Sequence, residues 1–532
     1  MSNSSQNTAI LMDAELIRLC LDDGTTYVSR EGEIMSADPK SAPKLDEIVQ
    51  YVKALPTMIG KDIKVSQVTQ EQVEGVIEIM SQTTSKNYEH SQDSELGKFF
   101  TSLCQAAVNA SASDIHIEVN KESTRFLMRV DGKREILKRL SNGQSALHQT
   151  RKIGVALASY IFATLGKQDI KLRDPANDRF EILLETRDGH EKPFEWRVGL
   201  IPLNHGVKMT LRCVTSGTAA LSLSDMDLPA SYINVLNSMI HKRGGAIVVC
   251  GPMGSGKSTL ITALIELIDR VARCVFALED PVEFEQEGVC KTTVEPKKEI
   301  IIGEGRYRDY AYYAVETLRH DVDVSVLGEV REYAAAKEFC RKAETGGLAI
   351  TTLHTNSAVG VPQTFIQQLK IPAAIVGAPG LMLMFVHQKL VRKLCQCALP
   401  LDEAQATYES MGLSSEFETK RNQLKFLLKE KASLARVINP NGCECCQGKG
   451  EKGRLVVMEI IVLDDIDRQY IAREDDHGWK SHLEQQGWPD IQAHTLSRIR
   501  RGQVDIASAA EQVDGLMPIN VTETYKEMRE AL

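Results

Sequence analysis

Short apolar runs alternate with amphipathic stretches over the middle of the chain, a pattern typical of α/β proteins. Buried strands are predicted at residues 247–250, 274–278, 322–327 and 348–353, and a helix at 260–268 follows the first of them. Strands that alternate with helices indicate a parallel sheet covered on both faces. We therefore expect an α/β domain over residues 230–394.

The first 215 residues show a different organisation. Helical periodicity at 46–55 and 69–80 predicts a small helical N-terminal module at 1–94, which ends in a polar stretch. Strands are predicted at 114–119 and 125–130, and Asp131-Gly132, between Val130 and Lys133, is a hairpin signal. Residues 193–214 supply two more strands. These elements predict an α+β domain at 95–215, followed by a linker at 216–229.

The remainder of the chain divides into a cysteine-containing subdomain at 395–465 and a helical region at 466–532. The most apolar segment, residues 371–386, contains two prolines and two glycines, and no run of 18 apolar residues occurs. We therefore expect this segment to be buried in the protein and not to span a membrane.

Composition changes this picture only through charge and cysteine. The 532 residues carry a net charge of −9, which argues against a general grip on nucleic acid. The first 95 residues hold 16 acidic and 8 basic residues, a net of −8. That balance suggests a protein partner for the N-terminal module, although a solvated acidic surface is the more common explanation of such a balance. Twelve cysteines without a visible secretory signal favour reduced thiols or metal, and a cytoplasmic protein.

One stretch carries specific chemistry, because it fits the phosphate-binding pattern G-x-x-x-x-G-K-[ST] between a predicted strand and a predicted helix. Its glycines let backbone N–H groups approach phosphates, Lys257 would reach the β- and γ-phosphates, and Ser258 would ligate Mg²⁺. The pattern predicts a nucleoside triphosphate as ligand. The loop consists of Gly251, Pro252, Met253, Gly254, Ser255, Gly256, Lys257, Ser258 and Thr259.

Polar residues follow the other predicted strands of this domain. Residues 279–283 carry carboxylates, Glu283 among them, at the end of a strand, where open α/β sheets bind ligands. An ordinary acidic loop is the alternative. Gly328 stands where many triphosphatases place an aspartate beside the phosphate loop, so Glu329 is a candidate base. His354 follows the last of these strands and is a candidate sensor of the γ-phosphate.

These motifs together resemble the hexameric secretion ATPase family that drives type II secretion and type IV pilus assembly. The resemblance covers about residues 95–465. The matching motifs are Ser113-Asp114-Ile115-His116-Ile117-Glu118, the phosphate loop, Glu279 to Glu283, Leu318-Arg319-His320-Asp321, Gly328-Glu329-Val330-Arg331, Thr345-Gly346-Gly347 through Asn356, and Gly442-Cys443 through Gly453-Arg454 with Glu459.

The resemblance implies a PAS-like domain followed by a RecA-like ATPase domain that uses ATP and Mg²⁺. It implies an acid at Glu283, an atypical Walker B acid at Glu329 and a His-box residue at His354. It also implies that Arg197 and Arg212 of the PAS-like domain reach the triphosphate, although either could be an ordinary edge-strand charge.

The chain departs from the family pattern in several places. Gly347 replaces the first histidine of the His box, so only His354 can act there. Glu332 stands where aspartate is usual, and residues 177–180 replace the usual Asp-Gly-Arg run. These changes leave the expected fold intact and affect the finer roles.

The function implied by the resemblance is that of a homo-hexameric motor for type IV pilus assembly. It would work on an inner-membrane platform protein, with a cytoplasmic adaptor at the N-terminal module. It would lie in the cytoplasm, associated with the inner membrane through its partners. A type II secretion motor is the first alternative, and a nucleotide-dependent scaffold without turnover is an alternative of another class. A DNA translocase is disfavoured because no basic stripe is evident.

Cysteines cluster in two places, Cys395 with Cys397 and, after 45 intervening residues, residues 443–446. Thiolates paired at short spacing on two loops suit tetrahedral zinc. The resemblance also implies a four-cysteine zinc site here, usually built from two C-x-x-C pairs. We expect zinc on Cys395, Cys397, Cys443 and Cys446, with Cys445 as an alternative ligand. The alternative is a remnant of such a site that binds no metal and in which the cysteines are merely reduced or packed.

Overall fold

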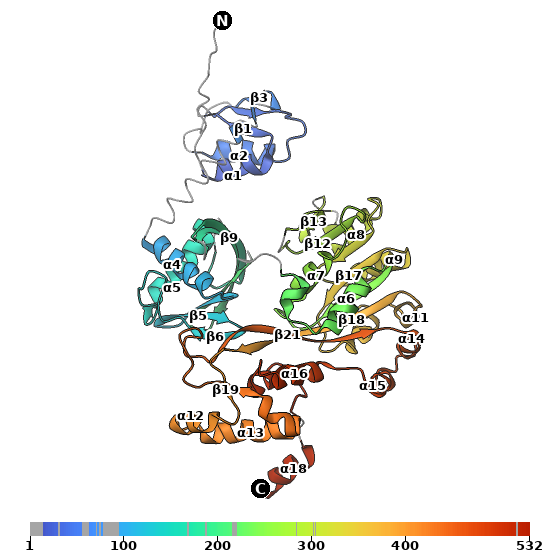
Figure 1. Cartoon of the computed structure of the whole chain (residues 1–532). Coiled ribbons are helices and arrows are strands. Elements are labelled where there is room, and N and C mark those ends of the chain that lie inside the picture. The colour runs from blue at the N-terminus through green and yellow to red at the C-terminus, as the bar shows by residue number, and fades with distance from the viewer. Residues whose placement is uncertain are drawn as a thin grey trace. The chain divides into compact units, whose positions relative to one another are not determined.

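The structure is a computed structural model of the chain (Figure 1). It describes residues 14–29, 32–55, 63–70, 72–73, 76–77, 95–166, 170–186, 189–214, 221–282, 285–301, 303, 305–517 and 520–532. The chain forms two compact units. The first comprises residues 1–111, 115–128 and 136–211, and the second comprises residues 112–114, 129–135 and 212–532.

The N-terminal module contains a sheet as well as helices. Helices α1 (Ala14–Asp23) and α2 (Leu45–Ala54) accompany a three-stranded sheet of β1 (Thr26–Val28), β2 (Ile34–Ser36) and β3 (Val65–Gln67). The helix expected at 46–55 is confirmed, while the one at 69–80 lies partly outside the described residues. The prediction of a helical module was wrong, because strands of three residues are too short to show an alternating pattern.

The rest of the first unit holds a seven-stranded sheet in the order β6-β5-β4-β10-β9-β8, with β7 on β5. The predicted strand at 114–119 and the hairpin at Asp131-Gly132 are confirmed, and both turn residues have positive φ. Phe100 and Leu103 of α4 are buried. The elements here are α4 (Glu95–Asn109), β4 (Asp114–Val119), β5 (Ser123–Val130), β6 (Lys133–Ile136), β7 (Gln149–Thr150), α5 (Arg151–Ser159), β8 (Ala176–Glu185), β9 (Glu191–Leu203) and β10 (Gly206–Cys213).

The second unit is built on another seven-stranded sheet, in the order β13-β12-β16-β17-β11-β18-β21. Its neighbours run parallel except for the antiparallel pair β18–β21. The strands are β11 (Gly245–Cys250), β12 (Val275–Glu279), β13 (Val289–Thr293), β16 (Val324–Leu327), β17 (Leu348–Leu353), β18 (Met382–Leu394) and β21 (Glu451–Val462).

Both faces of this sheet are covered. Alternate residues of β11 enter two different cores: Val248 packs with Phe339 of α9, and Val249 packs with Leu260 of α7. A parallel sheet buried on both faces produces the continuous apolar strands seen in the sequence. The helices around it are α6 (Ala230–Ile240), α7 (Lys257–Ile265), α8 (Tyr310–Thr317), α9 (Tyr333–Glu344), α10 (Gly360–Gln363) and α11 (Ala373–Val376).

Strand order corrects one expectation about the neighbourhood of the phosphate loop. The strand that ends at Leu327 does not lie beside β11, because β17 pairs with both β11 and β16. Sequence order alone could not reveal this crossover. The sheet also extends to β21, which the sequence analysis assigned to the cysteine region.

Between β18 and β21 the chain inserts two helices and a two-stranded sheet, and helices follow β21 to the end, as predicted. Leu424 of the insertion and Ile499 of the C-terminal region share one core. The elements are β19 (Leu399–Pro400), α12 (Ala404–Ser410), α13 (Ser414–Leu428), β20 (Arg436–Val437), α14 (Asp465–Ala472), α15 (Asp476–Gln485), α16 (Ile491–Arg500), α17 (Ile506–Ala510) and α18 (Val521–Glu530), with the small ribbon β14 (Glu295–Glu299) and β15 (Tyr307–Arg308) near α8.

Among the described residues, no helix has the length and apolar character needed to cross a membrane.

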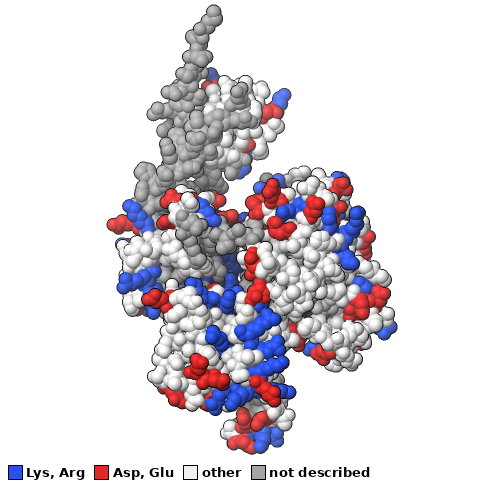
Figure 2. Space-filling model, viewed as in Figure 1, with Lys and Arg blue, Asp and Glu red and all other residues white. Residues whose placement is uncertain are grey.

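The acidic total charge hides a local basic surface. Figure 2 shows Lys and Arg side chains gathered on the face where β21, α16 and α13 lie in Figure 1. Lys393, Arg436 and Arg501 are exposed, and Gly502 contacts Arg436 while the N–H of Leu394 donates to Gln503. Three distant segments therefore bring these charges together, so the expectation of no basic surface was wrong. The exclusion of nucleic acid stays a prediction.

Candidate nucleotide-binding site and cysteine cluster

The predicted phosphate loop lies between β11 and α7, and its backbone needs glycine. Gly251, Gly254 and Gly256 all have positive φ. A Cβ at Gly251 would lie 2.2 Å from the carbonyl oxygen of Gln388, so only glycine lets the loop approach the neighbouring strand β18 this closely. The loop leads directly into the N-terminus of α7, which begins at Lys257. A helix N-terminus with a glycine-rich approach suits a phosphate group.

Lys257 is largely buried and lies over its own loop. Its Nζ donates to the carbonyl oxygens of Gly251 at 2.9 Å and Pro252 at 3.0 Å. Ser258 is exposed and Thr259 half-buried at the start of α7. Both hydrogen-bond partners of this ammonium are neutral carbonyls. A negatively charged phosphate forms stronger bonds to an ammonium and can therefore replace them.

His354 and Glu329 meet beside the loop. His354 Nε2 lies 3.2 Å from Glu329 Oε1, and His354 Nδ1 lies 3.2 Å from the carbonyl oxygen of Gly251. Both follow strands whose ends are tied together, since the N–H of Val330 donates to Thr352 and the Thr352 hydroxyl donates to Gly328. The sheet thus brings together the ends of β11, β16 and β17, where the sequence placed a candidate base and a candidate sensor.

Arg331 holds Glu329 by two hydrogen bonds that the sequence analysis did not foresee. Its Nε and Nη2 donate to the two carboxylate oxygens at 2.5 and 2.7 Å. This bond raises the pKa of the Arg331 guanidinium. In the sequence Arg331 is only the last residue of the motif Gly328-Glu329-Val330-Arg331. The spacing of that motif does not show that the Arg331 side chain bonds to Glu329, two residues earlier.

Tyr310 closes the same region from α8. Burial, and then the negative charges of Asp280 and Glu329, raise the pKa of its phenol. The hydroxyl therefore stays neutral and acts only as a hydrogen-bonding group near the ends of β12 and β16. Sequence reasoning missed this residue because a tyrosine in an apolar helix carries no distinguishing signal.

The acidic segment after β12 is separated from the phosphate-loop strand β11 by two strands, β16 and β17. Glu279 pairs with the buried Lys291 of β13 at 3.0 Å. Glu283 lies outside the described residues, so its predicted role stays a prediction.

The two predicted arginines have different environments. Arg197 lies half-buried on β9 in the first unit, in register with Arg179 of β8. Arg212, at the end of β10, forms an ion pair with the buried carboxylate of Asp114, with Nε 2.9 Å from Oδ1. Asp114 belongs to a quoted motif, and the structure identifies it as the residue that holds Arg212.

Four cysteines converge where β18 ends and β21 begins. The Sγ atoms of Cys395, Cys397, Cys443 and Cys446 all lie within 4.8 Å of one another. Neighbouring sulfurs are separated by 3.6 Å (395–443), 3.9 Å (397–446) and 3.7 Å (443–446). A tetrahedron with zinc–sulfur distances of about 2.3 Å has edges of about 3.8 Å. The geometry therefore fits a four-thiolate zinc site.

Cys445 lies outside this cluster. It is exposed, and its sulfur contacts Lys452 Nζ at 3.5 Å. Cys446 is buried, which raises its pKa, but hydrogen bonds outweigh this and lower the pKa to about 6. They come from the backbone N–H groups of Cys443 and Gly450, each 3.1 Å from its sulfur, and from the thiols of Cys443 and Cys397. Such N–H···S bonds stabilise a thiolate, the form that binds metal. Three cysteines outside the cluster behave differently: Cys104 and Cys250 are buried and Cys213 is half-buried, and burial raises the pKa of Cys250 to about 12.

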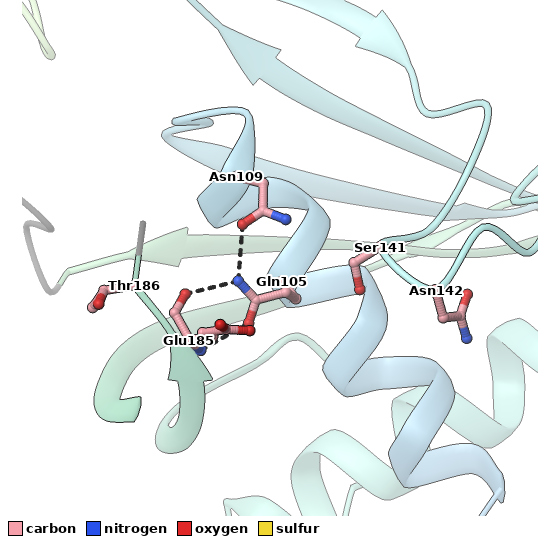
Figure 3. Close-up of a pocket in the computed structure, with 6 residues that line it drawn as sticks. All are labelled: Gln105, Asn109, Ser141, Asn142, Glu185 and Thr186. Atoms are coloured by element: carbon pink, nitrogen blue, oxygen red, sulfur yellow. Dashed lines mark hydrogen bonds between the residues drawn. The ribbon is translucent and has the colours of Figure 1, made fainter. Parts of the chain in front are cut away.

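A separate pocket of about 410 Å³ lies in the first unit (Figure 3). Its polar groups satisfy one another: Gln105 Nε2 donates to Asn109 and to the carbonyl of Glu185, while Gln105 Oε1 accepts from the Glu185 N–H. None of the predicted site residues lines it, so it does not compete with the phosphate loop as a candidate site. The residues around it are Gln105, Asn109, Ser141, Asn142, Glu185 and Thr186.

Comparison with known proteins places this geometry in context. The sequence model of one family, described as Type II/IV secretion system protein, matches residues 89–515. The type II secretion system protein E of Pectobacterium carotovorum subsp. carotovorum is 30% identical over 388 residues, covering 72% of this chain and 68% of that protein. Its counterpart in Aeromonas hydrophila is 28% identical over 417 residues, covering 78% and 75%.

Two further proteins are similar at lower identity. The type IV pilus assembly ATPase PilB of Thermus thermophilus is 26% identical over 463 residues, which cover 85% of this chain and 46% of that protein. The X-ray structure of the ATPase DotB from Legionella pneumophila superposes with a TM-score of 0.52 at 17% identity, covering 77% of this chain and 93% of that one. The latter likeness concerns the fold alone.

Proposed function

The chain belongs to the type II/IV secretion system protein family, and on this basis we propose that it is an ATP-hydrolysing motor that drives type IV pilus assembly. The observation that carries the proposal is the convergence of Lys257, His354 and Glu329 at one edge of the sheet. Members similar to this chain are named as ATPases, which agrees with such a site. In this proposal residues 230–394 are a RecA-like ATPase domain and residues 95–215 are a PAS-like domain.

The residues present fit a magnesium-bound triphosphate. The glycine cradle against Gln388, the start of α7 and the ammonium of Lys257 would hold the phosphates, and Ser258 would ligate Mg²⁺. The bound metal would supply charge neutralisation on the phosphates. Glu329 would accept a proton from the attacking water, and His354 would link that carboxylate to the loop through Gly251.

Turnover requires two of the observed contacts to be exchanged. Glu329 must release one of its oxygens from Arg331, because a carboxylate with both oxygens occupied accepts a proton poorly. Arg212 must likewise leave Asp114 before it can act on a phosphate. We propose that Arg197 and Arg212 complete the site when the ring closes, in a homo-hexamer that works on an inner-membrane platform protein.

Pilus assembly is our first candidate because the match to PilB spans 85% of this chain, against 78% and 72% for the two secretion relatives. A type II secretion motor is the second candidate, favoured by the higher identity of those relatives, 28–30% against 26%. Both roles use the same site, and both place the protein in the cytoplasm, bound to the inner membrane through partners such as an adaptor on the N-terminal module.

Deletion of the gene separates the two candidates. We expect loss of surface pili with unchanged protein secretion, restored by the wild-type chain. Electron microscopy of the cells and analysis of the culture medium provide the two readouts. A deletion strain that keeps its pili and loses secreted proteins would replace pilus assembly by secretion, and unchanged pili and secretion would remove both.

Zinc is expected at about one atom per chain, held by Cys395, Cys397, Cys443 and Cys446 and contributing folding energy to the insertion. Four thiolates leave no open position for water, so the metal would be structural. Elemental analysis of Cys446→Ser should show loss of most of the zinc. The matched variant Cys445→Ser, which alters an exposed cysteine one residue away, should keep it. If Cys446→Ser keeps its zinc and Cys445→Ser loses it, the fourth ligand is Cys445 and not Cys446.

A further inference from the structure

A single residue of β18, Gln388, supports the phosphate loop from the neighbouring strand. Strand β18 pairs with β11 in parallel, with Cys250 opposite His387. The next residue, Gln388, therefore lies beside Gly251, where the loop leaves β11. Gln388 is only 1% exposed. Gln388 lies on a strand that is paired on both sides, by β11 and β21. Glutamine is rarely buried at such a position, and its polar atoms need hydrogen-bond partners there.

Gln388 contacts the loop at three points. Its Nε2 donates to the carbonyl oxygen of Ser255 at 2.6 Å. Its backbone carbonyl oxygen lies 2.2 Å from the position that a Cβ on Gly251 would take, and its Nε2 lies 2.9 Å from the corresponding position at Gly256. The start of the loop at Gly251 and its middle at Ser255 and Gly256 therefore contact this one residue.

The bond to Ser255 determines the direction of a donor. In a trans peptide the N–H points opposite to the C=O. Because the Ser255 carbonyl points toward the Gln388 side chain, the N–H of Gly256 in the same peptide is held pointing away from that side chain. Backbone N–H groups that point out of the loop are the groups that bind phosphate.

The amide of Gln388 is otherwise poorly used. Its Oε1 is buried and has no hydrogen-bond partner among the described residues. An unpaired buried acceptor destabilises a fold, so an apolar side chain of similar size would serve a purely structural purpose better. The bond to the loop is therefore what distinguishes glutamine from methionine or leucine at this position.

We propose that Gln388 is a positioning residue that presets the phosphate loop for nucleotide before nucleotide arrives. The inference rests on the proposed function, since it assigns a role toward the same triphosphate. The loop does not have to reorganise on binding if its peptide planes are already oriented, and less binding energy is then spent on ordering it. Loss of Gln388 should thus weaken nucleotide binding more than it alters the chemical step.

The test compares two glutamines with matched surroundings. Gln286 is also buried, its Nε2 donates to the backbone carbonyl of Thr262 at 3.1 Å and to Glu266, and its Oε1 is buried without a partner among the described residues. It contacts the body of α7 instead of the loop. Gln388→Met and Gln286→Met therefore remove similar bonds from the same unit, and only one of them touches the loop.

For Gln388→Met we expect the Kd for Mg-ATP and the KM to rise about tenfold, with kcat within about threefold of wild type. Gln286→Met should leave Kd and KM unchanged, while the Tm values of the two unliganded variants fall by similar amounts. Equal Kd values in the two variants would overturn the role of Gln388. If Gln388→Met does not fold, Gln388→Asn, which keeps an amide that is too short to reach Ser255, is measured with the same expectation. A wild-type chain that binds no Mg-ATP would overturn the proposed function itself, whereas normal wild-type binding with an unaffected Gln388 variant overturns only this inference.

Discussion

Glu329→Gln is expected to bind Mg-ATP with near wild-type affinity and to hydrolyse it at least about 100-fold more slowly. The substitution keeps the shape of the side chain and one hydrogen bond from Arg331, whose Nε and Nη2 now contact the two oxygens at 2.5 and 2.7 Å. An amide cannot accept a proton from water. Nucleotide affinity depends on the phosphate loop, from which Glu329 is separated by His354.

The control for this variant is Glu338→Gln on α9. Glu338 is also a largely buried glutamate paired with an arginine, Arg341, at 3.4 Å, but it lies away from the loop. Steady-state phosphate release and equilibrium binding of a fluorescent ATP analogue separate turnover from affinity. Glu329→Gln with turnover close to that of Glu338→Gln would remove Glu329 from the mechanism. Wild-type protein that binds ATP and never hydrolyses it would favour the nucleotide-dependent scaffold instead.

Lys257→Ala should weaken Mg-ATP binding about 100-fold, which corresponds to ~3 kcal/mol for lost charge-assisted hydrogen bonds. Lys257 is 9% exposed, and its ammonium donates to the carbonyls of Gly251 and Pro252, so it is already in place for a phosphate. Turnover should disappear as a consequence of lost binding. The unliganded variant should remain folded, because the two carbonyls belong to a loop with exposed residues on one side.

Lys389→Ala provides the comparison. Lys389 lies on β18 with a side chain that is 12% exposed, and it pairs with Asp514 at 2.9 Å. Its removal deletes a lysine of similar burial from the same unit without touching the loop, so ATP affinity should be unchanged. Calorimetric titration with Mg-ATP and a non-hydrolysable analogue measures both variants. Equal affinity in Lys257→Ala and wild type would contradict the assignment of the phosphate loop.

Several elements were predictable because their signal is local. The strands at 114–119 and 348–353 were predicted at the bounds that the structure has, and the strand before the phosphate loop within two residues. Apolar runs bounded by turns identify buried strands, and positive-φ glycines identify tight loops. The thiolate pairs were likewise evident from spacing, although the choice between Cys445 and Cys446 depended on how the turn directs each side chain.

Other features depend on contacts between residues that are distant in sequence. Three features are of this kind: the two strands that separate β12 from β11, the bond of Gln388 to the phosphate loop, and the ion pair of Asp114 with Arg212. The residues involved are about 30 to 130 positions apart in the sequence. Single-sequence patterns report the periodicity of one segment and carry no information about its neighbour in the sheet. The same reason explains why the short strands of the N-terminal module and the basic surface around Arg436 were missed.

The amino-acid sequence by itself was enough to predict a nucleoside triphosphate as the ligand and the elements that would bind it, because phosphate recognition uses glycines, a lysine and a helix start within nine consecutive residues. It also determined that cysteines would cluster, because the ligand pairs are local. Only the tertiary structure decided which strands lie next to the loop, that Arg331 holds Glu329, that His354 bridges Glu329 to Gly251, and that Gln388 supports the loop from below. Those relations arise from strand order and side-chain direction, which are set when the sheet assembles around its core and not by any one segment.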